Sequence, residues 1–323
     1  MEKKSKIRFT EIDVYRGWAI LLVIFGHSFC EFPVNLREDF ASLQTFISSF
    51  NMSMFFWISG LLFSVSGPWA DFFNKKLKRL MLPWIVFVVL SITMRTVAGS
   101  FTHSHIGSFG HELLLAVTTA KYYWFLYALF LMMLLTRAIK NKWLLALVGG
   151  GIFTVHVVGI KPTWNALLIN RLFNYYPWFV MGFLLKGCYQ EMSGYVKSHI
   201  AALGIIACMM FLTIAIVNVG GMMVKIPVVT PLCLCACLWI MAVGLTTYFD
   251  NERFFTWFGK YSLQYYLNHL LIMMGCFYVG ARCYVVSPLL SLIVVFLLGV
   301  TIATAMLLVE KRFKWLRTLC GFN

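Results

Sequence analysis

Charged residues are scarce in this sequence. They make up 12% of its 323 residues, whereas a soluble globular domain carries about 25%. Long polar stretches are scarce as well, and the longest are residues 31–42, 66–80, 99–112 and 249–261. This composition excludes an ordinary soluble domain and predicts a polytopic integral membrane protein. Residues 1–323 are therefore expected to form a single transmembrane domain, with its chemistry inside or at the edges of the bilayer.

Signals for export, disulfide bonds and metal binding are also missing. The first apolar run begins late for a cleavable signal peptide, and no small-residue cleavage site follows it. None of the nine cysteines forms a CxxC pair. Cys233, Cys235 and Cys237 are close in sequence, but on a helix Cys235 points away from the other two, so they cannot form a tetrahedral metal site. We therefore expect small packing residues and no bound metal.

Apolar runs of about 20 residues predict an all-α fold, because a helix of that length crosses the hydrocarbon core of a bilayer. About ten transmembrane helices are expected by this criterion. The runs cover residues 14–31, 43–65, 81–98, 113–136, 143–159, 172–187, 200–219, 227–248, 262–280 and 286–309. Lys121 interrupts the fourth run, which makes it the least regular.

Basic residues predict the orientation of these helices. If the N-terminus is cytoplasmic and the runs alternate, nineteen lysines and arginines lie in inside segments and seven in outside segments, with Arg16 inside the first run. The positive-inside rule describes such a bias, so both termini are predicted to be cytoplasmic. The net charge of +15 fits contact with anionic lipid headgroups. No basic stripe alternates with exposed aromatics, so no nucleic-acid partner is expected.

Arg16 and His27 stand out because both are ionisable and both lie in the first apolar run. Ionisable groups in a membrane segment are costly to place and indicate function. Their separation corresponds to about three helical turns, so both side chains leave the same helix face, roughly 16 Å apart along the axis. This would suit a molecule held at one end by charge and modified at the other. The alternatives are a snorkelling Arg16 paired with Asp13, and a His27 that only bonds two helices together.

The spacing of these two residues resembles the hallmark of membrane-bound acyltransferase family 3, a basic residue and a histidine separated by ten residues in the first span. Here the motif reads R16-GWAILLVIFG-H27, preceded by the acidic Asp13. The second run contains FNMSMFFWISG, from Phe50 to Gly60. It resembles a family stretch in which proline usually stands at the position of Ser53.

Further motifs in the same order extend the resemblance over most of the chain. The family's two arginines before a proline correspond to K76-LK-R79, followed by LMLP. Lys76 keeps the charge of the first arginine but not its bidentate fork. Three later segments also resemble family motifs: WFLYALF from Trp124, YYPWFVMGFLL from Tyr175 and YSLQYYLNH from Tyr261. The resemblance implies a multi-pass enzyme of the bacterial inner membrane that acylates sugars of surface polysaccharides or related acceptors.

The resemblance also implies acetyl-coenzyme A, or another acyl-coenzyme A, as donor co-substrate on the cytoplasmic side, with no permanently bound cofactor. A nucleotide that carries several phosphates requires basic residues at the inner face. The residues predicted to bind it are Arg16, Lys75, Lys76, Lys78 and Arg79. Positive-inside topology alone is the other explanation of the lysine cluster.

His27 is the predicted catalytic residue. A neutral imidazole can act as general base on an acceptor hydroxyl that attacks the thioester, or it can carry the acyl group covalently. Both routes stay open. Arg16 shares the catalytic face of the first helix, and Asp13 is expected to orient Arg16.

Weaker predictions concern the carbohydrate acceptor. Ser59 is placed to reach His27 from the second run, while Asn268 and His269 lie near mid-depth in the ninth. His269 is a candidate for acceptor binding or proton transfer, with a structural hydrogen bond as the alternative. The candidates at the external acceptor entrance are His103, His105, His111 and Glu112. An ordinary polar loop is the alternative for these four residues, and a zinc site is not supported by their spacing.

Together these features predict an O-acyltransferase that moves an acetyl group from coenzyme A to a hydroxyl of a surface or lipid-linked carbohydrate. A transporter or flippase is the alternative, with Arg16, His27 and His269 as an ion or proton relay. Such folds often show inverted repeats and paired helix breaks, and neither is evident here. A polysaccharide-assembly scaffold without chemistry is a further hypothesis. Thioester cleavage would separate the enzyme from both.

Overall fold

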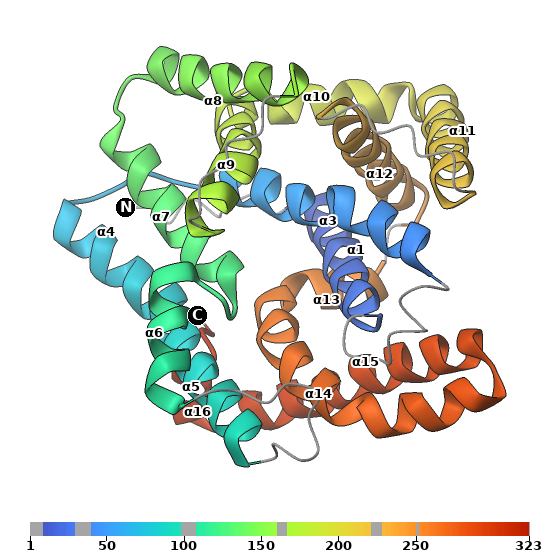
Figure 1. Cartoon of the computed structure of the whole chain (residues 1–323). Helices are drawn as coiled ribbons and strands as arrows, with labels where there is room; N and C mark the ends of the chain where they lie inside the picture. Colours follow the sequence, from blue (N-terminus) through green and yellow to red (C-terminus); the bar gives the residue numbers. More distant parts are fainter. Residues whose placement is uncertain are drawn as a thin grey trace.

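The computed structural model describes residues 9–29, 40–97, 108–159, 167–220, 228–249 and 252–322, and every regular element within them is a helix (Figure 1). The all-α prediction is therefore confirmed. The elements up to residue 157 are α1 (Thr10–His27), α3 (Ala41–Leu61), α4 (Trp69–Lys76), the π-helix η1 (Leu77–Met81), α5 (Leu82–Val97), α6 (Phe109–Thr119), α7 (Trp124–Ala138) and α8 (Lys142–Val157). The later ones are α9 (Leu167–Leu185), α10 (Tyr189–Ser198), α11 (Ile200–Val219), α12 (Val229–Tyr248), α13 (Phe254–Lys260), α14 (Ser262–Val286), α15 (Pro288–Arg312) and α16 (Lys314–Leu319).

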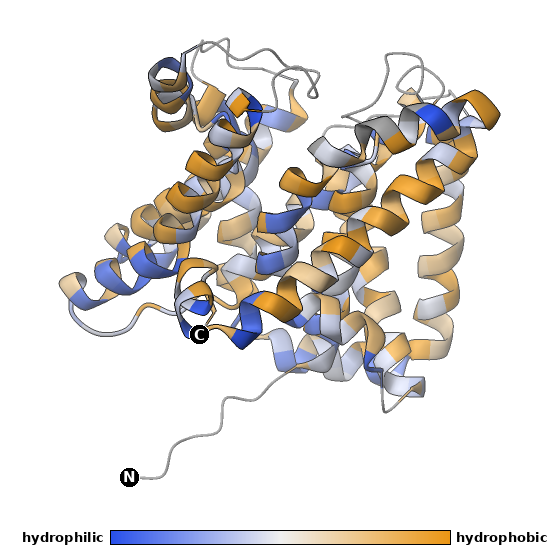
Figure 2. Ribbon diagram, turned by 90° about the horizontal axis from the view of Figure 1, so that it is seen from below, coloured by the Kyte–Doolittle hydropathy of each residue, from blue (hydrophilic) through white to orange (hydrophobic). Residues whose placement is uncertain are grey.

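Each predicted apolar run overlaps one of these helices over most of its length, and the fourth run overlaps two. Within the described residues, five helical stretches are long and apolar enough to cross a membrane. They are Trp69–Val97, Phe109–Ala138, Ile200–Val219, Val229–Tyr248 and Pro288–Arg312. Figure 2 shows hydrophobic residues along much of the length of the helices. The structure is thus that of a helical membrane protein.

Several other helices carry polar side chains, and these side chains are turned into the protein. Glu11 and Asp13 on α1, Asn51 on α3, and Asn268 and His269 on α14 are all buried. A polar group that faced lipid would lack hydrogen-bond partners, so polar groups in membrane helices favour the protein interior. The interior around α1 and α14 is therefore where chemistry is expected.

The fourth apolar run is broken between α6 and α7. Ala120 and Tyr123 have φ angles of 52° and 48°, a left-handed conformation that is unfavourable for residues other than glycine. Side chains from two other helices contact this segment, one at its backbone and one at the side chain of Tyr123. Arg171 of α9 donates a hydrogen bond of 2.6 Å to the carbonyl oxygen of Ala120, and the Tyr123 hydroxyl lies 3.1 Å from that of Ser91 on α5. The interruption at Lys121 is thus a defined turn.

Two glycines allow α13 to cross α1 at close range. A Cβ atom added at Gly17 would overlap the carbonyl oxygen of Phe255, and one added at Gly259 would overlap that of Asp13. Small residues at such crossings let membrane helices approach closely. Figure 1 shows α1 near the middle of the molecule with α13 beside it. The crossing brings Lys260, the last residue of α13, to the end of α1 that carries Arg16.

The connection from α3 to α4 is held by Arg137 of α7. Its guanidinium donates hydrogen bonds to the carbonyl oxygens of Ser66 (3.3 Å) and Gly67 (2.6 Å). It also lies over the ring of Phe72, 4.4 Å from the ring centre. Because Lys76 ends α4, this clamp helps to position Lys76 relative to α7.

Candidate functional site

A cavity of about 590 Å³ lies where α1, α3, α7 and α14 meet the segments around α4, α13 and α16. Six basic residues line it: Arg16, Lys76, Arg79, Lys260, Lys311 and Arg317. No acidic residue is among the described residues of this lining. Apolar and aromatic side chains complete the wall, among them Phe55, Phe125, Leu129 and Met133. Such a basic cavity fits a ligand with several anionic groups and an apolar part.

Three of the residues predicted to bind the donor share this cavity. Arg16, Lys76 and Arg79 all line it. Arg79 lies on the π-helix η1, a type of turn that is frequent at functional sites. Lys75 and Lys78 lie on the same segment but are exposed and do not line the cavity. Their part in donor binding stays a prediction.

Three further cations were not singled out from the sequence. Lys260, Lys311 and Arg317 reach the cavity from α13, α15 and α16. The available signal was their location in segments predicted to be cytoplasmic, which many other basic residues share. Only the packing of distant segments shows which of them converge.

The pKa of Tyr261 reflects the positive charge at this part of the cavity. The Lys311 ammonium lies 4.8 Å from the centre of its ring. Burial raises the pKa of Tyr261, but a hydrogen bond from Lys311 and the charges of Lys260 and Lys311 outweigh it, so the pKa falls below its ordinary value. Nearby cations therefore stabilise negative charge here.

Arg16 has a carboxylate beside it. Asp13 Oδ1 lies 3.9 Å from Arg16 Nη1, and 23% of the Arg16 side chain is exposed. Asp13 itself is buried. The carboxylate lies one turn before the guanidinium that faces the cavity, and the orienting role of Asp13 stays a prediction.

His27 and His269 form a pair between α1 and α14. Their ring centroids are 4.8 Å apart. His269 is fully buried, and its Nδ1 lies 2.6 Å from the carbonyl oxygen of Tyr266. His269 Nε2 and His27 Nδ1 are both buried and have no hydrogen-bond partner among the described residues. Buried polar atoms normally have a partner, so this pair is an unusual feature of the interior.

Tyr266 connects the cavity to this histidine pair. It lines the cavity, and its hydroxyl accepts a hydrogen bond of 3.4 Å from the backbone N–H of Phe125. Its ring centroid is 5.4 Å from that of His269. A chain of ring contacts, from Tyr266 to His269 and from His269 to His27, therefore links the wall of the basic cavity to His27.

Asn268 and Ser59 have different surroundings. Asn268 Nδ2 donates a hydrogen bond of 2.8 Å to Glu310 Oε1, and both residues are buried. Glu310 was not singled out from the sequence. Ser59 lines the basic cavity, and no hydrogen bond among the described residues joins it to His27.

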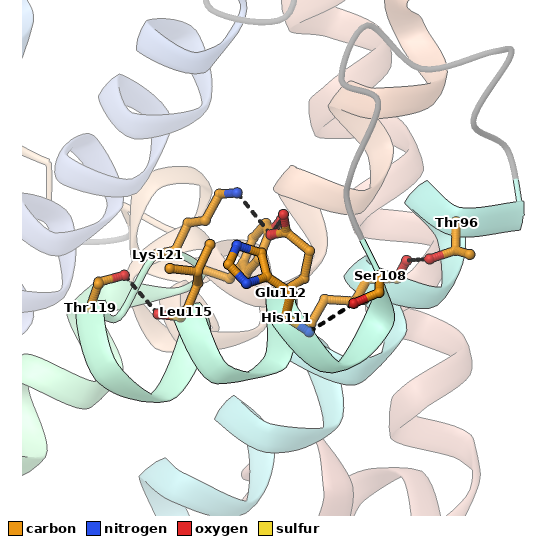
Figure 3. A network of polar contacts seen from close by, with 9 residues as sticks. Thr96, Ser108, His111, Glu112, Leu115, Thr119 and Lys121 are labelled. Carbon is orange, nitrogen blue, oxygen red and sulfur yellow. Dashed lines mark hydrogen bonds and ion pairs between the residues drawn. The ribbon is translucent and has the colours of Figure 1, made fainter.

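His111 and Glu112 lie on α6 and do not line the cavity. Glu112 Oε2 accepts hydrogen bonds from Lys121 Nζ (2.8 Å) and from the Tyr122 hydroxyl (2.7 Å). Figure 3 shows His111 and Glu112 in this local network, with the backbone N–H of His111 bonded to the Ser108 hydroxyl at the start of the helix. His103 and His105, proposed for the same entrance, lie outside the described residues.

Comparison with known proteins assigns the chain to a family. Residues 9–309 match the sequence profile of an acyltransferase domain. Searches of curated proteins and of solved structures gave no match. The profile covers the motif from Arg16 to His27, the cavity residues from α1 to α14, and nearly all of α15. The chain therefore belongs to acyltransferase family 3.

Proposed function

We propose that this protein is an inner-membrane O-acyltransferase that moves an acetyl group from coenzyme A to a hydroxyl of a surface or lipid-linked carbohydrate. The observation that carries the proposal is the cavity lined by six basic side chains, in a member of an acyltransferase family. Coenzyme A carries a pyrophosphate and a ribose phosphate, which arginine and lysine bind through charge-assisted hydrogen bonds. The apolar wall from α3 and α7 suits the uncharged arm that bears the thioester.

The cavity accepts the donor from the cytoplasm. Five of its six cations, all except Arg16, come from segments that the charge bias assigns to the inside. This convergence supports a cytoplasmic donor site and cytoplasmic termini, in a chain that crosses the membrane about ten times.

His27 is the residue that catalyses the acyl transfer. As general base it takes the proton of the acceptor hydroxyl while the hydroxyl oxygen bonds to the thioester carbon. The carbon–sulfur bond then breaks, the proton passes to the departing sulfur, and free coenzyme A leaves as the thiol. In the covalent route the imidazole attacks first and the acceptor hydroxyl then removes the acyl group. Both routes have the same products.

Thiol release tests the proposal. The purified protein is incubated in detergent with acetyl-coenzyme A and a glycolipid extract, and free thiol is measured for the wild type and for His27→Ala. Release by the wild type alone supports the enzyme. If neither protein releases thiol and coenzyme A does not bind, the acyltransferase is contradicted, and proton-coupled uptake would then support the transporter.

A further inference from the structure

Two buried nitrogens without partners belong to neighbouring rings. His27 Nδ1 and His269 Nε2 have no hydrogen-bond partner among the described residues, and the centroids of their rings are 4.8 Å apart. A buried donor or acceptor left alone loses the bonds that water would supply. The two nitrogens are not hydrogen-bonded to each other in this structure, but a rotation of the rings that joined them would satisfy both atoms at once.

The bond to Tyr266 determines which nitrogen of His269 carries hydrogen. A carbonyl oxygen only accepts hydrogen bonds, so in the 2.6 Å contact with the oxygen of Tyr266 the donor is His269 Nδ1. A neutral imidazole carries one hydrogen. His269 Nε2 therefore presents a lone pair, and this lone pair can accept a hydrogen bond.

The direction of this hydrogen bond also determines which nitrogen of His27 carries hydrogen. If His27 Nδ1 donates to His269 Nε2, the hydrogen of neutral His27 is on Nδ1 and its Nε2 is bare. No hydrogen bond among the described residues occupies His27 Nε2. The ring is then in the tautomer that a general base requires, with its free lone pair available to a hydroxyl.

We propose that His269 is a positioning residue: when the two neighbouring rings turn toward each other, it accepts a hydrogen bond from His27 Nδ1 and holds His27 in its proton-accepting tautomer. The inference rests on the proposed acyl transfer. When the acceptor oxygen bonds to the thioester carbon, its proton moves to His27 Nε2. The His27 Nδ1–H bond to His269 stabilises the resulting imidazolium, and the proton later passes from Nε2 to the sulfur as the carbon–sulfur bond breaks.

Two substitutions at His269 separate its bond to the carbonyl oxygen of Tyr266 from its proposed bond to His27. In His269→Asn the amide nitrogen still reaches the carbonyl oxygen of Tyr266, but nothing stands in place of Nε2. In His269→Gln the amide oxygen lies near the position of Nε2 and can accept from His27, while the bond to Tyr266 is lost. We expect His269→Asn to lower kcat by about 10- to 100-fold, the size of loss known for removing the partner that orients a metal-bound histidine. His269→Gln should stay within a few-fold of the wild type, and both should keep the KM for acetyl-coenzyme A.

If His269 has a purely structural role through its bond to Tyr266, the order of the two kcat values is reversed, and His269→Asn keeps more activity than His269→Gln. Wild-type kcat in His269→Asn, or equal losses in both variants at equal Tm, would overturn the proposal. Nitrogen-15 spectra of the histidine rings provide a readout independent of activity, with the His27 signal identified by its loss in His27→Ala. A protonated Nδ1 on neutral His27 supports the proposal, and a protonated Nε2 overturns it. Absence of thiol release in the wild type would contradict the proposed function. The spectra would then still decide whether His27 and His269 are hydrogen-bonded as proposed.

Discussion

Gly259 lies directly against the carbonyl oxygen of Asp13, where no larger side chain fits. Through this contact α13 packs on the part of α1 that carries Arg16, and Lys260 follows at once in the chain. Two cations of the basic cavity, Arg16 and Lys260, are therefore positioned by a helix crossing that depends on close contacts between backbone atoms and two glycines, Gly17 and Gly259.

Replacing Gly259 with alanine should force this crossing apart. Overpacking of a close contact costs about 1–3 kcal/mol, so we expect a lower Tm in detergent and weaker binding of coenzyme A. Gly204→Ala on α11 is the matched control, because an added Cβ atom there meets nothing within 4 Å. Equal Tm values for the two variants would show that the contact is unimportant.

The double variant Lys311→Ala/Arg317→Ala should weaken donor binding. Each charge-assisted hydrogen bond contributes about 1.5–3 kcal/mol, so loss of one or two such bonds should raise the KM for acetyl-coenzyme A by at least about 10-fold while changing kcat little. The control is Lys140→Ala/Lys142→Ala, which removes two exposed lysines from a segment also predicted to be cytoplasmic. If both pairs raise KM equally, general surface charge rather than the cavity attracts the donor. Lys75→Ala/Lys78→Ala should have a smaller effect than the cavity pair.

Glu112→Gln tests the role of the network on α6. The substitution removes the charge that pairs with Lys121 but keeps an oxygen for the Tyr122 hydroxyl. We expect a lower Tm, because the paired ammonium loses its carboxylate next to the strained turn that contains Ala120 and Tyr123. Lys121→Gln and the double variant complete the cycle, and the two losses should be less than additive. An unchanged Tm with a raised KM for the carbohydrate would instead support the predicted role at the acceptor entrance.

The helices could be predicted from the sequence because apolar run length is a local property. The turn between α6 and α7 was marked by Lys121, whose charge interrupts the run. The left-handed backbone at Tyr123 could not be predicted, since it depends on contacts from other helices such as the bond to Ser91. Close crossings such as that at Gly17 likewise require knowledge of which helices meet.

The candidate site was predicted in part. Arg16, Lys76 and Arg79 were indicated by motif and charge, and the structure brings them to one cavity. Lys311 and Arg317 were missed because a positive-inside bias gives every cytoplasmic lysine and arginine the same weight. The sequence marks His269 only as a histidine in an apolar run. That its ring lies beside His27, and that its Nε2 has no hydrogen-bond partner among the described residues, depends on how α14 packs against α1.

Equilibrium binding of coenzyme A to three purified proteins tests the central claim, that the basic cavity holds the donor and His27 acts on it. The wild type and His27→Ala should bind with similar Kd, because His27 does not line the cavity. Lys76→Ala/Arg79→Ala should bind at least about 10-fold more weakly, through the loss of charge-assisted hydrogen bonds. Equal binding by all three proteins, or loss of binding in His27→Ala alone, would contradict the account.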